Sequence, residues 1–172
     1  RFALARGLGD VYKRQRNNGI RAAKGKFIAF QDSDDVWAST KLEKQVNSFN
    51  SAPSDLGVVY TSFWLIDDGK ETFVPSSHVK KAEGKIHDAL LETNFVSLSS
   101  AIVRRECFEK VGMFADIPRF QDWELWLRIS KYYAFKHLNG PLVKVYRQPD
   151  SISRNPKAFI SCLLYTSPSP RD

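Results

Sequence analysis

Three carboxylates fall within four residues at Asp32-Ser33-Asp34-Asp35, directly after the apolar run 26–30. Carboxylates this close repel one another, so their charged forms are destabilised unless solvent or a cation offsets the repulsion. Hard divalent cations that also carry phosphate ligands suit such a set of oxygens. Ligands of α/β sheets bind beyond the carboxyl ends of strands, which is where this cluster falls. The sequence therefore predicts a metal-assisted phosphate site; an acidic turn that merely caps the following helix is the alternative.

A further carboxylate, Asp122, begins an aromatic stretch that is predicted to be helical. Trp123, Trp126 and Leu127 follow it, and their spacing is typical of the buried face of a helix. A carboxylate at the start of such a helix can stand where the helix enters a pocket, and can then act as a general base toward a hydroxyl nucleophile. The alternative is an N-capping Asp on an amphipathic core helix.

Arg16 and Asn17 offer hydrogen-bond donors to phosphate or hydroxyl groups, although the stretch 16–19 also suits a plain turn or a helix end. Cys107 lies beside Phe108 on a predicted helix with no obvious base near it, which favours a core thiol over a nucleophile. The three histidines share no spacing typical of metal ligands and are expected on the surface or partly buried: His78, His87 and His137.

Strands and helices alternate along the sequence, which predicts an α/β fold. The run 26–30 indicates a buried strand, and Gly25 before it is expected to end a helix at the C′ position. Thr40 and Glu43 have capping-box spacing at the start of another helix. Further helices are predicted at 86–91, 105–111 (ended by Gly112) and 122–133, and further strands at 56–66, 71–74, 96–103 and 141–146.

The chain has 172 residues, of which 42% are hydrophobic and 13% aromatic, so it fits at most one globular domain and is not a disordered chain. No stretch approaches the roughly 18 apolar residues that a membrane-spanning helix needs. Two cysteines exclude a small disulfide-rich module. The net charge of +7 comes from scattered basic residues rather than a stripe, so no nucleic-acid partner is expected.

Both ends of the chain are expected to be non-native. One DNA sequence can encode residues 162–172 on one strand and residues 6–15 on the complementary strand. The pair resembles a transposon-derived sequencing adaptor that is translated at both ends of a short fragment. We therefore expect residues 1–15 and 162–172 to derive from an adaptor. Residues 16–161 are then expected to belong to a natural protein that is truncated on both sides.

The natural stretch resembles the middle of a family 2 glycosyltransferase domain with the GT-A fold. The resemblance rests on Arg-Asn-Asn-Gly-Ile at 16–20, on Phe-Gln-Asp-Ser-Asp-Asp-Val-Trp at 30–37, and on the order and spacing of the stretches 41–45, 99–112, 121–128 and 142–147. A lone Asp-x-Asp motif would be a weak signal, but this ordered set is specific. The resemblance implies an incomplete, Rossmann-like nucleotide-sugar transferase domain that lacks its N-terminal strands.

The same resemblance implies the roles of the carboxylates. Asp32 and Asp34 match the family's Asp-x-Asp motif, whose carboxylates hold a divalent metal, Mn²⁺ or Mg²⁺, on the diphosphate of a nucleotide-sugar donor and contact the ribose. Asp122 matches the acidic residue that deprotonates the acceptor hydroxyl, so that this hydroxyl attacks the anomeric carbon and inverts its configuration.

Four other residues are expected to bind substrate. Arg16 and Asn17 would contribute donors, and Trp37 and Trp123 would flank the sugar or the acceptor. The acceptor is expected to be a saccharide or a lipid-linked saccharide, in the synthesis of a cell-surface or extracellular polysaccharide. The resemblance places the enzyme in the cytoplasm or at the cytoplasmic face of the membrane, and allows peripheral membrane association of the full-length protein.

Three departures from the family pattern matter. The segment that forms the first strands and the nucleotide-base pocket does not precede residue 16, so we expect an inactive fragment whose unpaired edge strand favours aggregation. Gln121 stands where Glu is typical, which supports a non-catalytic saccharide-binding module as an alternative. The stretch 147–153 lacks the His often found there, which puts a third protein ligand for the metal in doubt.

A second enzymatic alternative also starts from the acidic turn. The stretch 30–36 allows a haloacid-dehalogenase-like phosphatase, in which Asp32 would be phosphorylated and Asp34 would be the acid/base. This alternative lacks the downstream Lys and acidic pair that such phosphatases need.

Overall fold

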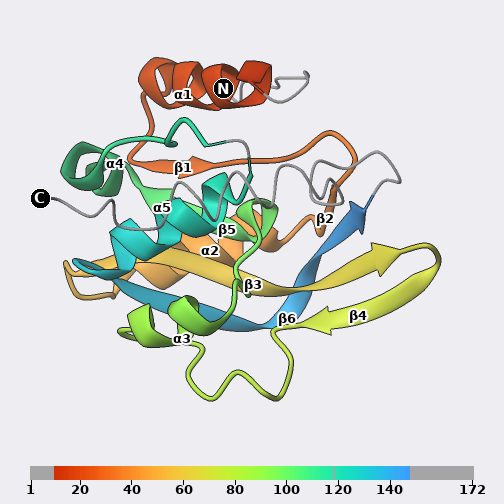
Figure 1. Ribbon diagram of the computed structural model, residues 1–172. Coiled ribbons are helices and arrows are strands. Elements are labelled where there is room, and N and C mark those ends of the chain that lie inside the picture. The colour runs from red at the N-terminus through yellow and green to blue at the C-terminus, as the bar shows by residue number, and fades with distance from the viewer. Residues whose placement is uncertain (1–9, 118, 148–172) are drawn as a thin grey trace, which may run out of the picture.

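A six-stranded mixed sheet with helices on both faces forms the body of the molecule (Figure 1). The computed structural model describes residues 10–117 and 119–147. The strands are β1 (Phe27–Ala29), β2 (Val36–Trp37), β3 (Leu56–Asp67), β4 (Lys70–Val74), β5 (Ala101–Arg104) and β6 (Ala134–Arg147). The helices are α1 (Asp10–Ala22), α2 (Lys41–Asn50), α3 (His87–Glu92), α4 (Arg105–Val111) and α5 (Gln121–Ser130), with a 3₁₀ turn η1 (Leu98–Ser100).

The strand order is β1-β5-β3-β6-β2, and β4 pairs with β3 as a hairpin. β3 and β6 are parallel, and the other pairs among the described residues are antiparallel. β1 and β2 are the two outer strands of this order, so the short strands that flank the acidic turn 32–35 lie at opposite edges of the sheet. The turn therefore crosses the sheet from one edge to the other beyond the strand ends (Figure 1).

β3 is the central strand, and its residues 56–63 are all buried. Its alternate side chains face different helices, as the two-residue period of a strand requires. Val58 and Tyr60 belong to the larger core, which includes Leu125 and Trp126 of α5. Val59 belongs to a smaller core under α2. A strand covered on both faces explains why the predicted stretch is apolar almost throughout.

Several predicted elements are confirmed, including the strand after Gly25, the hairpin and the helix ended by Gly112, whose φ of 83° is in the left-handed region. The predicted helix 122–133 is too long. It ends at Ser130: Tyr132 and Tyr133 both donate to Ile129 O in a final turn, and Ala134 then donates to Asp55 O as β6 begins.

Three local predictions were wrong. The serine-rich first part of the predicted strand 96–103 is the turn η1, which Ser100 closes through bonds from its amide and hydroxyl to Ser97 O. Thr40 makes no side-chain capping bond, so the capping box does not form. Helix α1 ends at Ala22, so Gly25 is not its C′ residue.

Candidate active site

The acidic turn is closed by its own backbone and attached to η1. Asp35 N donates to Asp32 O at 3.1 Å, and Gln31 Nε2 donates to Asp35 O at 3.4 Å. Asp32 N donates to Ser99 Oγ at 3.4 Å, across 67 residues of chain. The turn thus has a defined shape directly after β1.

The three carboxylates of the turn differ in exposure. The Asp32 side chain is 41% exposed and Asp34 is exposed, whereas Asp35 is buried. Burial raises the pKa of Asp35 to about 7, and the negative charges of Asp32 and Asp34 add to this, against hydrogen bonds from Ser99 and from Tyr146 N. Asp35 therefore anchors the turn to β6, while Asp32 and Asp34 remain open to a ligand.

Arg16 of α1 connects the acidic turn with the predicted base. Its Nη2 donates to Asp32 Oδ1 at 3.0 Å and to Oδ2 at 3.4 Å. Its positive charge also lowers the pKa of Asp122, so the guanidinium lies near both carboxylates. Three predicted site residues that are far apart in sequence thus share one region of the molecule.

Asp122 lies in the first turn of α5, shortly after Phe120, whose φ of 58° is in the left-handed region. Its Oδ1 accepts from Trp123 N at 2.8 Å, and its Oδ2 accepts from Asn94 Nδ2 at 3.3 Å. Phe120 occupies the N-cap position, so the alternative of an N-capping Asp122 is wrong. Burial raises the pKa of Asp122, against the hydrogen bonds and Arg16. A carboxylate with a raised pKa is a stronger base once it is ionised.

The other predicted substrate-binding residues have structural contacts. The Asn17 side chain makes two hydrogen bonds to the backbone of Phe114. Its Nδ2 donates to Phe114 O, and its Oδ1 accepts from Phe114 N, each at 3.0 Å. Trp123 Nε1 donates to Leu90 O at 2.6 Å. Trp37 packs against α2, where the Lys41 ammonium lies 3.9 Å from its ring centroid. Asn17 and Trp123 therefore support backbone near Arg16 and Asp122, whereas Trp37 lies under α2. Contact of all three with substrate stays a prediction.

Sequence reasoning missed Ser99 and Asn94, which position Asp32 and Asp122. The sequence signal that could have revealed them is the set of polar residues interspersed in the stretch 94–100. Polar side chains in a buried segment seldom lack hydrogen-bond partners. Ser99 is buried, and this is explained by its bond to the acidic turn.

The residues fit a metal only if phosphate completes the site. The described residues contain no group of three or more His, Cys, Asp or Glu side chains that could hold a metal ion. Asp32 and Asp34 supply hard oxygen ligands on an open turn, which suits Mg²⁺ or Mn²⁺ that keeps water and phosphate ligands rather than a closed protein cage. Arg16 occupies Asp32 and would have to share it.

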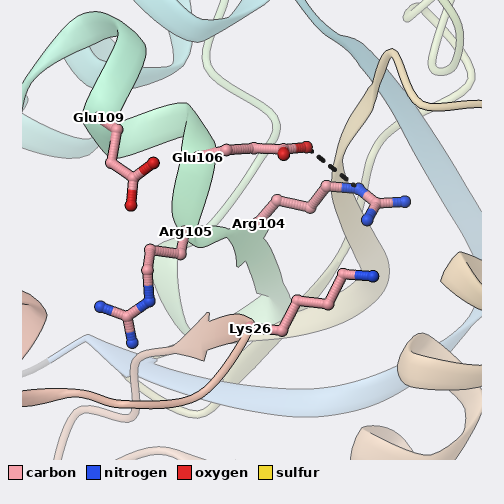
Figure 2. A pocket seen from close by; sticks show the side chains of 5 residues that line it. All are labelled: Lys26, Arg104, Arg105, Glu106 and Glu109. Atoms are coloured by element: carbon pink, nitrogen blue, oxygen red, sulfur yellow. Dashed lines mark ion pairs between the residues drawn. The ribbon is translucent and has the colours of Figure 1, made fainter.

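A separate cavity of about 210 Å³ lies at the other end of β1 (Figure 2). Lys26 and Arg104 extend side by side along it, and Arg104 pairs with Glu106 at 3.8 Å. Arg104 Nε also donates to Leu56 O, and Arg105 Nε donates to Gly25 O. These charged groups bind the protein's own backbone and carboxylates, and the cavity contains none of the predicted site residues.

Residues 9–112 match the family described as glycosyl transferase family 2. The chain belongs to this family. The match includes the acidic turn and Arg16, and it ends before Asp122. Membership removes the support for the phosphatase alternative.

Curated relatives are similar over part of their length. The chain is 30% identical over 131 residues to the Escherichia coli UDP-Glc:alpha-D-GlcNAc-diphosphoundecaprenol beta-1,3-glucosyltransferase WfaP, covering 76% of this chain and 49% of that protein. It is 26% identical over 136 residues to an uncharacterized glycosyltransferase of Methanocaldococcus jannaschii, covering 78% and 46%. The chain spans about half the length, or less, of these relatives.

Solved structures share the fold. Staphylococcus aureus TarS 1-349 superposes with a TM-score of 0.59 at 19% identity, covering 78% of this chain and 40% of that chain. The same protein in complex with UDP superposes at 0.56 and 20% identity, covering 80% and 40%. The predicted GT-A α/β fold is thereby confirmed. No helix among the described residues combines the length and the apolar character needed to cross a bilayer.

Proposed function

We propose that this chain carries the metal-binding turn and the base of an inverting glycosyltransferase. The enzyme moves a sugar from a nucleotide-sugar donor to a hydroxyl acceptor. The observation that carries the proposal is Arg16, which bonds Asp32 at 3.0 Å and whose charge reaches Asp122. A donor diphosphate at the turn and an acceptor hydroxyl at Asp122 would therefore be neighbours.

In this proposal Asp122 removes the proton from the acceptor hydroxyl. The oxygen attacks the anomeric carbon as the bond from that carbon to the diphosphate breaks, and the bonding electrons leave with the nucleoside diphosphate. Asn94 and Trp123 N hold the carboxylate, and Arg16 supplies positive charge where negative charge gathers. A divalent metal bound by Asp32 and Asp34 would offset charge on the diphosphate.

The named relatives support a lipid-linked acceptor. WfaP and WfgD of Escherichia coli carry names that specify UDP-Glc and a GlcNAc-diphosphoundecaprenol acceptor. We propose the same classes of donor and acceptor here, in surface polysaccharide synthesis at the cytoplasmic face of the membrane with peripheral association. The adaptor origin of residues 1–15 and 162–172 also stays a proposal: 1–9 and 162–172 lie outside the described residues, and 10–15 lie in α1.

Calorimetric titration of the chain with UDP-glucose and Mn²⁺ tests the donor part. Because the nucleotide-base pocket is expected to be missing, we expect binding through the diphosphate that requires Mn²⁺, weakens in Asp34→Asn and persists in Asp122→Asn. Asp88→Asn, an exposed aspartate on α3, is the control. Mn²⁺-independent saccharide binding that Asp122→Asn leaves unchanged would instead favour the non-catalytic module.

A transfer assay tests turnover separately. We propose that the chain alone does not transfer glucose from UDP-glucose to a lipid-linked GlcNAc acceptor. Metal-dependent transfer by this chain would contradict the proposed inactivity and would support the proposed reaction.

A further inference from the structure

Lys41 is a fully buried lysine whose charge the reaction above does not use. Its side chain lies between α2 and the sheet with no exposed area, and its Nζ has no hydrogen-bond partner among the described residues. The ammonium lies 3.9 Å from the centroid of the Trp37 ring. Burial lowers the pKa of Lys41 to about 7, because the charged amine loses its hydration there. A methionine would fill the same space without this cost.

The ring and the ammonium occupy the layer between α2 and one face of the sheet. Trp37 pairs with Val143, and Val143 pairs with Phe63 of β3, so these three side chains share a sheet face. Gln45, one helical turn after Lys41, donates from Nε2 to Val59 O of β3. The site carboxylate Asp122 belongs to α5, which packs on the opposite face.

Hydrogen bonds hold Gln45 in this layer, but they do not orient the side chains of Trp37 and Lys41. Within the described part of the chain, Trp37 Nε1, Gln45 Oε1 and Thr61 Oγ1 are also buried without a hydrogen-bond partner. The cation on the ring face is therefore the directional contact that orients Trp37.

The end of the acidic turn depends on Trp37. β2 has two residues, and it is held by its pairing with β6 and by Ala38 N donating to Leu142 O at 2.9 Å. Val36, the other residue of β2, is 54% exposed and contributes little packing. The start of the turn is held at Asp32 by Ser99 and Arg16. Its end is held at Asp35, through Tyr146 N, and at the Trp37 ring.

We propose that Lys41 is a positioning residue: its ammonium, seated on the Trp37 ring, fixes β2 against β6 and so holds Asp32 and Asp34 in the geometry that binds donor and metal. The role in donor and metal binding rests on the proposed function. The contact between the Lys41 ammonium and the Trp37 ring, which we call the clamp, is a property of the fold. Lys41 touches neither carboxylate and acts through Trp37.

Amide hydrogen exchange of the ¹⁵N-labelled chain tests the clamp. At pH 6, below the Lys41 pKa of about 7, the amine is charged. There we expect exchange in Lys41→Met at the amides of Ala38 and Asp35, which bond Leu142 O and Asp32 O, to become roughly tenfold faster while β3 amides keep their protection. Lys44→Met, an exposed lysine on the same helix, should change neither. Unchanged exchange at Ala38 and Asp35, or an equal loss in β3, would overturn the proposal.

A second pair of variants keeps the test decisive if Lys41→Met does not fold. Trp37→Phe retains a ring face for the ammonium and should retain protection at Ala38, whereas Trp37→Leu should lose it. Equal protection in both variants would overturn the clamp. Mn²⁺ titration of the unmodified chain separates the clamp from the proposed metal site. If Mn²⁺ does not change the amide signals of Asp32 and Asp34, the metal site is contradicted. The exchange result still decides the clamp.

Discussion

At the scale of single residues, the site places charged groups where the fold alone would not favour them. Asp122 and Lys41 both lose hydration on folding, which favours the neutral form of each. Burial therefore raises the pKa of Asp122 and lowers the pKa of Lys41. A buried charge without full compensation reduces stability. We interpret this cost as the consequence of the proposed base, Asp122, and the proposed positioning cation, Lys41.

Asp122→Asn should raise stability at neutral pH. Because the folded pKa of Asp122 is raised, the folded state binds more protons than the unfolded state above the ordinary aspartate pKa of 3.8, so stability is lost as pH rises from there through the folded pKa. Asparagine removes this loss. Urea unfolding from pH 4 to 8 should show a difference between variant and parent that grows with pH; a variant that is less stable throughout would contradict the assignment.

Lys41→Met should also stabilise the chain, with the opposite pH dependence. The folded pKa of about 7 lies below the ordinary lysine pKa of 10.5, so the unfolded state binds more protons between these values and stability rises with pH there. We expect a gain on the order of 5 kcal/mol below pH 7 that shrinks toward pH 10. Denaturant unfolding at several pH values measures it, with Lys44→Met as the unaffected control; a pH-independent difference would show that Lys41 does not titrate as described.

At the scale of elements, β3 packs tightly at Gly57 against α4 and the residue before β6. A Cβ built on Gly57 would meet Tyr133 Cβ at 2.6 Å and Cys107 Sγ at 2.7 Å. Cys107 is buried, and its Sγ lies 3.6 Å from Gly57 O, so the predicted core thiol is confirmed. Glycine at position 57 therefore permits the approach of α4 to the central strand.

Two glycine substitutions should change stability in opposite directions. Gly57→Ala overpacks this contact and should cost about 2 kcal/mol. Gly19→Ala, inside α1 with no atom within 4 Å of the added Cβ, should gain about 0.8 kcal/mol from helix propensity. Thermal unfolding of both variants measures the signs; a neutral Gly57→Ala would mean that α4 and β6 move apart easily.

The elements that the sequence predicted well are those set by local pattern. The apolar run of β3 and the left-handed Gly112 after α4 each depend on neighbouring residues alone. The start of β6 after α5 depends on Asp55 O, a distant partner. The turn η1 is closed by its own serines but also binds distant groups, Asp32 N and Gln45 Nε2. Local periodicity contains no information on such partners.

At the scale of the whole molecule, the site is assembled from segments far apart in the chain. The cluster at 32–35 was predicted as an acidic site, but its sequence does not reveal that Asp35 turns inward to Tyr146 N, 111 residues away. The proximity of Arg16 to both Asp32 and Asp122 likewise requires α1, the turn and α5 together. Sequence supplied the residue types, and the tertiary fold decided which of them meet.

We propose above that Asp32 and Asp34 bind a divalent ion that faces Asp122. Paramagnetic broadening of ¹⁵N-labelled amide signals by Mn²⁺ tests it most directly. We predict selective broadening at Asp32, Asp34 and Asp122 that is lost in the Asp32→Asn, Asp34→Asn double variant. Broadening centred on Glu106 and Glu109 at the separate cavity, or none at Asp122, would contradict the account.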